Sequence, residues 1–243
     1  MKKYKIFDTV FYDDDFSYFV KNFKKKGYLV IPSGPGLSEI YDKSKYKESL
    51  NKSTFAIFDS SLLCILLRLV GIRVNKYSGY KFLADFFEYL KYQSDHILLI
   101  DPNENEKRSN YKLLNNINKN IEIINYVAPI YQSESIIDEE LIKLIKNKKP
   151  NFILINLGGF TQEPLANYII NNIDIDTFII CSGAAISFFT GHQANVNNTI
   201  DKFYLGWLVR CLKSPLIFIP RYIKALKLIY VFIKHKKGIE EIK

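Results

Sequence analysis

Cysteine, histidine, proline and glycine are all scarce in this chain of 243 residues, which has three Cys, three His, eight Pro and 11 Gly. Three cysteines far apart in the sequence give neither a disulfide framework nor a compact zinc site, and they indicate a reducing compartment. The low glycine and proline content excludes collagen-like and low-complexity sequences. An apolar leader is also lacking, because Met1 is followed by two lysines, by Asp8 and by three aspartates at 13–15. We therefore expect a protein without a secretory signal that stays in the cytosol.

Positive charge is concentrated near the end of the chain. About half of the residues are apolar (48%) and 24% are charged, which is typical of a globular protein with one sizeable core. The net charge is +9, and residues 201–243 hold ten Lys or Arg against three acidic residues, which leaves only +2 for residues 1–200. This distribution indicates a polyanionic partner at one part of the molecule, either nucleic acid or an anionic lipid surface.

Short apolar runs alternate with longer segments of helical period, which is typical of an α/β fold with a mostly parallel sheet. The expected strands are residues 28–31, 55–58, 97–100, 121–126, 152–156 and 177–180. The expected helices include residues 61–69, 81–92, 134–146 (with Ser133 or Ser135 as its cap) and 162–170. We predict a Rossmann-like α/β catalytic domain over residues 1–198, flanked by helices, and a basic helical appendage over residues 199–243.

Small and polar residues follow most of the expected strands. In an α/β sheet, ligands bind where strands end and helices begin. Glycine at such a junction lets the backbone approach phosphate, and a helix N-terminus offers free N–H donors. Ordinary turn chemistry is the alternative explanation for any single junction. No GxGxxG and no GxxxxGK[ST] occurs at a junction, which argues against a dehydrogenase and against a P-loop nucleotidase. The junctions are residues 32–36, 59–61, 101–103, 157–163 and 181–185.

The segment 216–233 is rich in Leu, Ile, Phe, Tyr and Val but is interrupted by Pro220, Arg221 and two lysines. Its longest uncharged run after Lys227 covers residues 228–233, which is too short to cross a bilayer. As a helix, it would carry apolar residues at 222, 223, 226, 229, 230 and 233 and lysines at 224, 227 and 234. Such a helix can lie on an anionic membrane surface. The alternative is a core helix with a solvated lysine face.

Several motifs, read in order, resemble those of the WecG/TagA/CpsF glycosyltransferases over roughly residues 28–225. They are Asp59 after a strand, the segment 78–83, Gly-Gly-Phe-Thr-Gln-Glu at 158–163, the segment 183–191, and Leu-Gly-Trp-Leu-Val-Arg at 205–210 with Pro215 and Arg221-Tyr222.

This resemblance implies an inverting, metal-independent enzyme without a cofactor. It would move a hexose from a UDP-sugar to a sugar carried by a polyprenyl diphosphate, in the synthesis of capsule, teichoic acid or O-antigen type polymers. We would expect it at the cytoplasmic face of the bacterial cell membrane as a peripheral protein, held by its C-terminal helix, and it could form a homo-oligomer.

The sequence departs from the family pattern at four places, so the chain resembles a divergent member. The usual T-x-N-P has Ser33 where the asparagine would be, and D-G becomes Asp59-Ser60. R-A-P becomes Asn-Val-Asn at 195–197, and Gly206 replaces the glutamate of L-E-W. The identity of the donor sugar therefore cannot be inferred from any one relative.

Asp59 is the expected catalytic base. It directly follows an apolar strand and matches the family's catalytic aspartate, and inverting transfer needs a base to take the acceptor's hydroxyl proton. The alternative is that Asp59 only caps the next helix. Gln162 and Arg221 are expected to share catalysis, and the guanidinium suits a diphosphate. The expected substrate-binding residues are Ser33, Gly34, Gly79, Gly158, Gly159, Glu163, Ser182, Gly183 and Arg210.

A metal site is not expected, because the sequence has no HxxH or HExxH pairing and no D-x-D at a strand–helix junction. The aspartates at 13–15 read as a helix cap, and Cys64, Cys181 and Cys211 as packing residues. The competing function is a non-catalytic membrane-surface binding protein on the same scaffold. A nucleic-acid partner is not expected, because residues 216–233 are mainly aliphatic.

Overall fold

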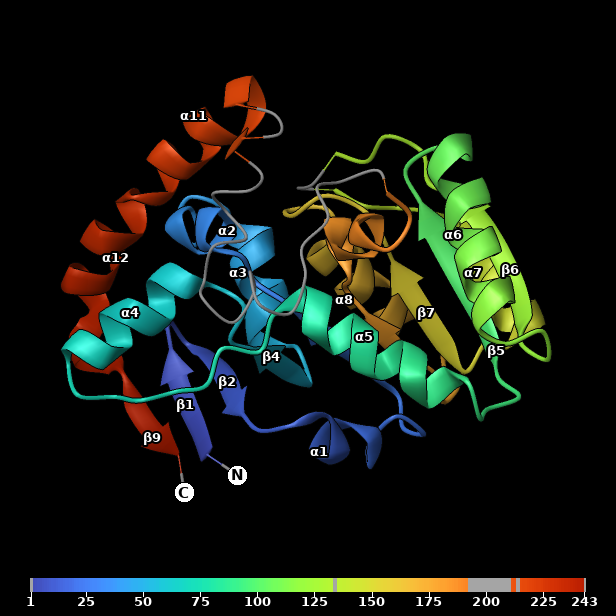
Figure 1. Ribbon diagram of the computed structural model, residues 1–243, viewed down its shortest axis with the longest axis horizontal. Helices are drawn as coiled ribbons and strands as arrows, with labels where there is room; N and C mark the ends of the chain where they lie inside the picture. The colour runs from blue at the N-terminus through green and yellow to red at the C-terminus, as the bar shows by residue number, and fades with distance from the viewer. Residues whose placement is uncertain (1, 133–134, 192–210, 213–214, 243) are drawn as a thin grey trace.

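The computed structural model describes residues 2–132, 135–191, 211–212 and 215–242, and it has a central sheet with helices on both faces (Figure 1). Within these residues nine strands form one sheet in the order β6-β5-β7-β8-β3-β4-β2-β1-β9. The strands from β6 to β2 are parallel to one another, whereas β1 pairs antiparallel with both β2 and β9. The expected α/β class with a mostly parallel sheet is confirmed.

The six strands expected from the sequence are all present, and none of their ends differs from the expectation by more than one residue. Except for the edge strand β6, which is only partly buried, they are buried on both faces, so parallel strands of this kind read as continuous apolar runs. The strands are β1 Lys2–Ile6, β2 Thr9–Asp13, β3 Gly27–Val30, β4 Phe55–Ile57, β5 His96–Asp101, β6 Glu122–Val127, β7 Phe152–Ile155, β8 Phe178–Ile180 and β9 Glu240–Ile242.

The helices follow the expected pattern with one clear error. The helix expected over 134–146 begins only at Glu139, because the side chain of Asp138 caps it by accepting a hydrogen bond from the Leu141 N–H. Ser135 instead forms an isolated bridge with Gln132, and Ser133 lies outside the described residues. The helices are α1 Phe16–Val20, α2 Gly34–Ser38, α3 Ser44–Asn51, α4 Ser61–Leu69, α5 Gly79–Leu90, α6 Glu104–Ile117, α7 Glu139–Lys148, α8 Gln162–Asn172, η1 Gly183–Phe188, α11 Pro215–Ala225, α12 Lys227–His235 and η2 Lys236–Gly238.

Alternate residues of each central strand feed two apolar cores, one on each face of the sheet. In β5, Leu98 and Ile100 belong to one core, and Ile97 and Leu99 belong to the other. Helices α2, α3, α4, α7, α8 and α12 cover the first core, and α1, α5, α6 and η1 cover the second. The buried Cys64 and Cys181 belong to the first core, which confirms them as packing residues.

The C-terminal segment is built into the same molecule. Leu228, Val231 and Phe232 of α12 are buried in the first core, and β9 adds an edge strand beside β1. Helices α11 and α12 pack against α2, and the two chain ends lie close together (Figure 1). In the part of the chain that is described, no helix is long and apolar enough to cross a bilayer. The division at residues 198/199 stays a prediction, because residues 192–210 are outside that part.

Candidate active site

The carboxyl ends of β3, β4 and β8 and the start of α8 carry the predicted site residues, and contacts link them. A methyl group added at Gly34, after β3, would lie 3.1 Å from the Ser60 Oγ, after β4. One added at Gly79 would lie 3.3 Å from the Ala185 Cβ, beyond β8, and one at Gly183 would lie 3.2 Å from the Gln162 Nε2. These glycines let the loops approach one another closely. The structure therefore brings the segments around Ser33, Asp59, Gly79, Gln162 and Gly183 to one edge of the sheet.

Asp59 lies directly beyond β4 and is half-buried. Its Oδ1 accepts a hydrogen bond of 3.0 Å from the Gly79 N–H, at the start of α5. The cap of α4 is Ser60, whose Oγ accepts from the Leu63 N–H at 3.2 Å. Asp59 therefore does not cap α4, because Ser60 has that role. Instead the carboxylate is held by the N-terminus of the next helix, where a negative charge interacts favourably with free N–H groups.

Ser33 caps the short helix α2, where its Oγ accepts a hydrogen bond of 3.4 Å from the Gly36 N–H. A side chain at Gly36 has no room, because an added methyl group would lie 2.6 Å from the Tyr46 Oη. The Tyr46 ring in turn packs edge-on against Phe160, with 5.0 Å between ring centroids. Tyr46 of α3 therefore lies between Gly36 of α2 and the loop that precedes α8.

Gln162 and Glu163 are both buried at the start of α8, after the exposed pair Gly158 and Gly159. The Glu163 Oε2 accepts a hydrogen bond of 3.2 Å from the Phe160 N–H, and its Oε1 accepts one of 3.0 Å from the Gln162 Nε2. Burial raises the pKa of Glu163 to about 7. The Gln162 Oε1 is buried and has no hydrogen-bond partner among the described residues.

A side chain at Gly183 is expected to lower both stability and activity, because of the positive φ of this residue and its closeness to the Gln162 amide. Its φ is +53°, and an added methyl group would lie 3.2 Å and 3.3 Å from the Gln162 Nε2 and Oε1. Gly183→Ala should cost about 1–2 kcal/mol of stability in denaturant unfolding. It should also displace the Gln162 amide and lower the activity of this site.

The matched control is Gly71→Ala, since Gly71 has a φ of +86° and nothing within 4 Å of an added methyl group. It should lose similar stability and keep full activity. Full activity in Gly183→Ala would show that the contact with Gln162 is not part of the site.

A buried polar cluster that the sequence did not reveal lies beneath this edge. The Ser182 Oγ donates to the Asn156 Oδ1 at 2.6 Å, and the Asn156 Nδ2 donates to the Asp101 Oδ1 at 2.7 Å. The Asn110 Nδ2 donates to the same Asp101 oxygen at 2.6 Å. Burial raises the pKa of Asp101. The Ser182 hydroxyl thus fixes its loop to β7 and β5. The sequence clue is a polar residue at the end of each of two apolar runs.

The C-terminal arginines are placed only in part. Arg221 is exposed on α11, which packs against α2, the helix capped by Ser33 (Figure 1). Arg210 and the motif stretches at 195–197 and 205–209 lie outside the described residues. The structure therefore puts the helix of Arg221 beside one wall of the candidate site and leaves the role of Arg210 as a prediction.

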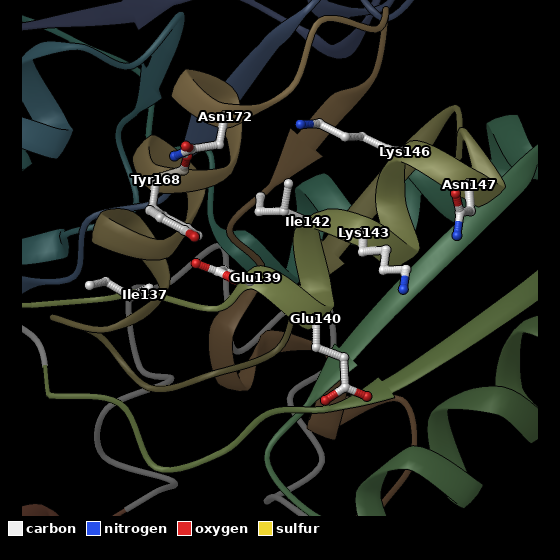
Figure 2. A pocket seen from close by; sticks show the side chains of 9 residues that line it. All are labelled: Ile137, Glu139, Glu140, Ile142, Lys143, Lys146, Asn147, Tyr168 and Asn172. Atoms are coloured by element: carbon white, nitrogen blue, oxygen red, sulfur yellow. The ribbon is translucent and has the colours of Figure 1, made fainter.

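A surface groove of about 780 Å³ lies between α7 and α8 (Figure 2). It shares no residue with the predicted site. The groove's lining includes Glu139, Glu140, Lys143 and Lys146 of α7 and Tyr168 and Asn172 of α8.

Nowhere in the described ranges do three or more His, Cys, Asp or Glu side chains form a group that could hold a metal ion. Metal independence stays a prediction from the sequence.

The fold and the polar edge together define an α/β protein with a candidate ligand site at the carboxyl ends of its strands. The chain belongs to the WecG/TagA/CpsF family of glycosyl transferases, whose family model matches residues 7–241. This match confirms the resemblance carried by the motifs and extends it to β2 and β9. The family implies transfer of sugar from UDP-sugars to lipid-linked acceptors in the synthesis of cell-surface polymers. A comparison with curated proteins finds no match.

Proposed function

We propose that this protein is an inverting hexosyltransferase that needs no metal and acts on a UDP-sugar and a polyprenyl-diphosphate-linked sugar. Family membership supports the reaction class. The observation that carries the proposal for this chain is the position of Asp59, which follows β4 and is held by the Gly79 N–H at 3.0 Å. A carboxylate fixed at this edge of the sheet has the chemistry of a general base.

In the proposed reaction, Asp59 takes the proton of the acceptor hydroxyl while that oxygen attacks the anomeric carbon. The new C–O bond forms on the face opposite the bond between this carbon and the β-phosphate oxygen. As that bond breaks, its electron pair leaves with UDP, and the configuration at the anomeric carbon inverts. The proton on Asp59 then passes to solvent. The Gly79 N–H keeps the carboxylate in one orientation during this step.

The leaving diphosphate needs hydrogen-bond donors and positive charge. We assign donor binding to the loops at this edge, with Gln162 contacting the hexose or the diphosphate. Arg221, and Arg210 from the family motif, would neutralise the phosphates, because a guanidinium stays charged and can donate two parallel hydrogen bonds. The residues proposed to line the substrate site are Ser33, Gly34, Gly79, Gly158, Gly159, Ser182 and Gly183.

Arg221→Ala tests the contribution of α11. Because the side chain is exposed, its loss should change the free energy of unfolding by no more than about 0.5 kcal/mol, while turnover falls strongly. Lys224→Ala, three residues further along α11 and also exposed, is the matched control and should retain turnover. Both variants are compared by steady-state transfer and thermal unfolding. Turnover equal to the parent in Arg221→Ala would exclude this residue from the site.

We also propose that α11 and α12 hold the protein at the cytoplasmic face of the membrane. The observation in favour is an apolar surface on these helices that faces away from the core. Exposed apolar side chains are normally scattered, and a contiguous set beside lysines is typical of a membrane-surface helix. The alternative of a core helix also applies in part, because the other face of α12 is buried in the first core. The apolar surface comprises Leu216, Ile219, Ile223, Leu226, Ile229, Tyr230 and Ile233.

The second candidate function is a non-catalytic membrane-surface protein on the same scaffold, favoured by the departures from the family pattern at Ser33, at residues 195–197 and at Gly206. The deciding experiment incubates the full chain with a panel of UDP-sugars and a synthetic polyprenyl-diphosphate sugar, with and without EDTA. We expect mass spectrometry to detect an acceptor enlarged by one hexose in both conditions. Vesicle binding without any product would favour the second function.

Self-association into a homo-oligomer stays a prediction, to be checked by light scattering.

A further inference from the structure

Glu163 and Gln162 form a buried pair whose hydrogen bonds leave one atom unused. Glu163 is 2% exposed, and both of its carboxylate oxygens already accept hydrogen bonds, from the Phe160 N–H and from the Gln162 Nε2. Both Glu163 oxygens are therefore occupied by hydrogen bonds within the protein, which leaves Glu163 without a free acceptor for a substrate. The Gln162 Oε1, buried beside Gly183, is the atom of the pair that has no hydrogen-bond partner within the described part of the chain. An unsatisfied buried acceptor is costly, so it indicates a partner that arrives with a ligand.

The protonation state of Glu163 determines which way the Gln162 amide faces. An ionised carboxylate only accepts hydrogen bonds, so the Gln162 Nε2 must point to it and the Gln162 Oε1 must point away. On protonation, the Glu163 Oε2 keeps its bond from the Phe160 N–H, and the proton therefore sits on the Glu163 Oε1. That new O–H donor needs an acceptor. A half-turn of the amide supplies one, by bringing the Gln162 oxygen to Glu163 and turning the NH₂ group outward.

We propose that Glu163 is a positioning residue that sets whether Gln162 offers an acceptor or a donor to the bound sugar nucleotide. With Glu163 ionised, Gln162 presents an oxygen suited to a hydroxyl of the hexose. With Glu163 neutral, Gln162 presents an NH₂ group suited to a carbonyl or phosphate oxygen. The identity of the ligand rests on the proposed function, whereas the orientation of the amide does not.

The groups around Glu163 leave this carboxyl as the titrating member of the cluster near neutral pH. Three titratable side chains face it: Tyr46 of α3, Tyr28 of β3 and Cys181 after β8. Burial raises the pKa of all three, so they stay neutral. The charged residue Glu48 of α3 is paired at the surface with Lys45 and Lys52. Burial alone is the cause that raises the pKa of Glu163 to about 7, which places its titration in an accessible range.

Glu163→Gln separates the two states, because the new amide can satisfy its neighbours in only one way. Its oxygen must accept from the Phe160 N–H, and its NH₂ group then faces Gln162, as the protonated carboxyl does. The variant should therefore hold the Gln162 amide in the turned orientation at every pH. Glu48→Gln, on the neighbouring helix α3 and partly exposed, is the matched control and should leave the amide unaffected.

The experiment follows the side-chain amide resonances of Gln162 in ¹H–¹⁵N spectra of the full chain between about pH 5.5 and about pH 8.5. The resonances are assigned by their loss in Gln162→Leu. In the wild type and in Glu48→Gln we expect them to titrate with a midpoint near that of Glu163. In Glu163→Gln they should stay at the low-pH position. Constant resonances in folded wild type, or high-pH positions in Glu163→Gln, would overturn the proposal.

A second readout links this orientation to the reaction. The kcat/KM of wild type for the UDP-sugar that proves to be the donor should change with the same midpoint. Glu163→Gln should lack this change and fall about tenfold below wild type above neutral pH, since one hydrogen bond to the sugar is lost. If no donor is turned over and the resonances still titrate, the positioning by Glu163 stands and the proposed function fails. An unchanged pH profile in an active Glu163→Gln would contradict the proposal.

Discussion

Asp59→Asn is expected to lower the rate of sugar transfer by about 10² to 10⁴, the range that a well-placed general base contributes. The substitution keeps an oxygen that can accept the hydrogen bond of the Gly79 N–H, so the start of α5 stays anchored. It removes only the ability to take a proton. We therefore expect thermal unfolding close to wild type together with a large fall in kcat under saturating donor and acceptor.

Asp13→Asn is the matched control for this substitution. Asp13 also ends a strand, β2, and its Oδ1 accepts a hydrogen bond of 3.0 Å from a backbone N–H, that of Asn75. It carries no predicted role in transfer, so its variant should keep full activity. Wild-type kcat in a correctly folded Asp59→Asn would show that this carboxylate is structural and would end the proposed mechanism.

Phe232→Ala should destabilise the protein by about 3–5 kcal/mol, because it removes a large side chain from a packed core. Phe232 is 3% exposed and lies in the same core as the central strands, although it belongs to the C-terminal α12. The expectation of a separate appendage predicts a much smaller loss. Ile233→Ala, at the next residue and 59% exposed, should change stability little. Urea unfolding measures both variants, and equal small effects would contradict the integration of α12 into the core.

A substitution at Ile233 also tests membrane binding separately from core packing. Ile233→Ser should weaken co-sedimentation with phosphatidylglycerol vesicles, because Ile233 belongs to the apolar surface of α11 and α12. Its free energy of unfolding should stay near wild type. Unchanged vesicle binding when Ile233 and the exposed Ile223 are both replaced by Ser would argue against a membrane role for this surface.

The central sheet was predictable from the sequence, and its antiparallel edge was not. Strands such as Phe152–Ile155 are buried on both faces and therefore read as apolar runs. In contrast, β1 carries three lysines, and β2 begins with a threonine and ends with an aspartate. The two strands meet at Phe7 and Asp8, which adopt positive φ angles without the usual Asn-Gly sequence. Strand β9 contains two glutamates, and its pairing with β1 brings Glu240 to 3.4 Å from Lys5, far away in sequence.

For the candidate site, the sequence predicted which residues take part but not which residues they would hydrogen-bond to. Asp59 was recognised because it follows an apolar run and matches the family's catalytic aspartate, and Ser33 because it lies in the junction after an expected strand, where the family has an asparagine. The hydrogen bond between Asp59 and Gly79 joins residues 20 positions apart, and the one between Asp101 and Asn156 joins residues 55 apart, so neither follows from local pattern. Glu163 was expected to bind substrate because it opens a helix. Its complete burial depends on packing of α8 against α3 and β3, which a single sequence does not reveal.

The most direct test of the central claim is a crystal structure of the full chain with a bound UDP-sugar. Our account predicts that the diphosphate lies at the edge formed by the loops of Gly158–Gly159 and Gly183, with the anomeric carbon facing Asp59. It also predicts that the guanidinium of Arg221 approaches the phosphates. A sugar nucleotide bound elsewhere, for example in the groove between α7 and α8, or an Asp59 carboxylate turned away from the sugar, would contradict it.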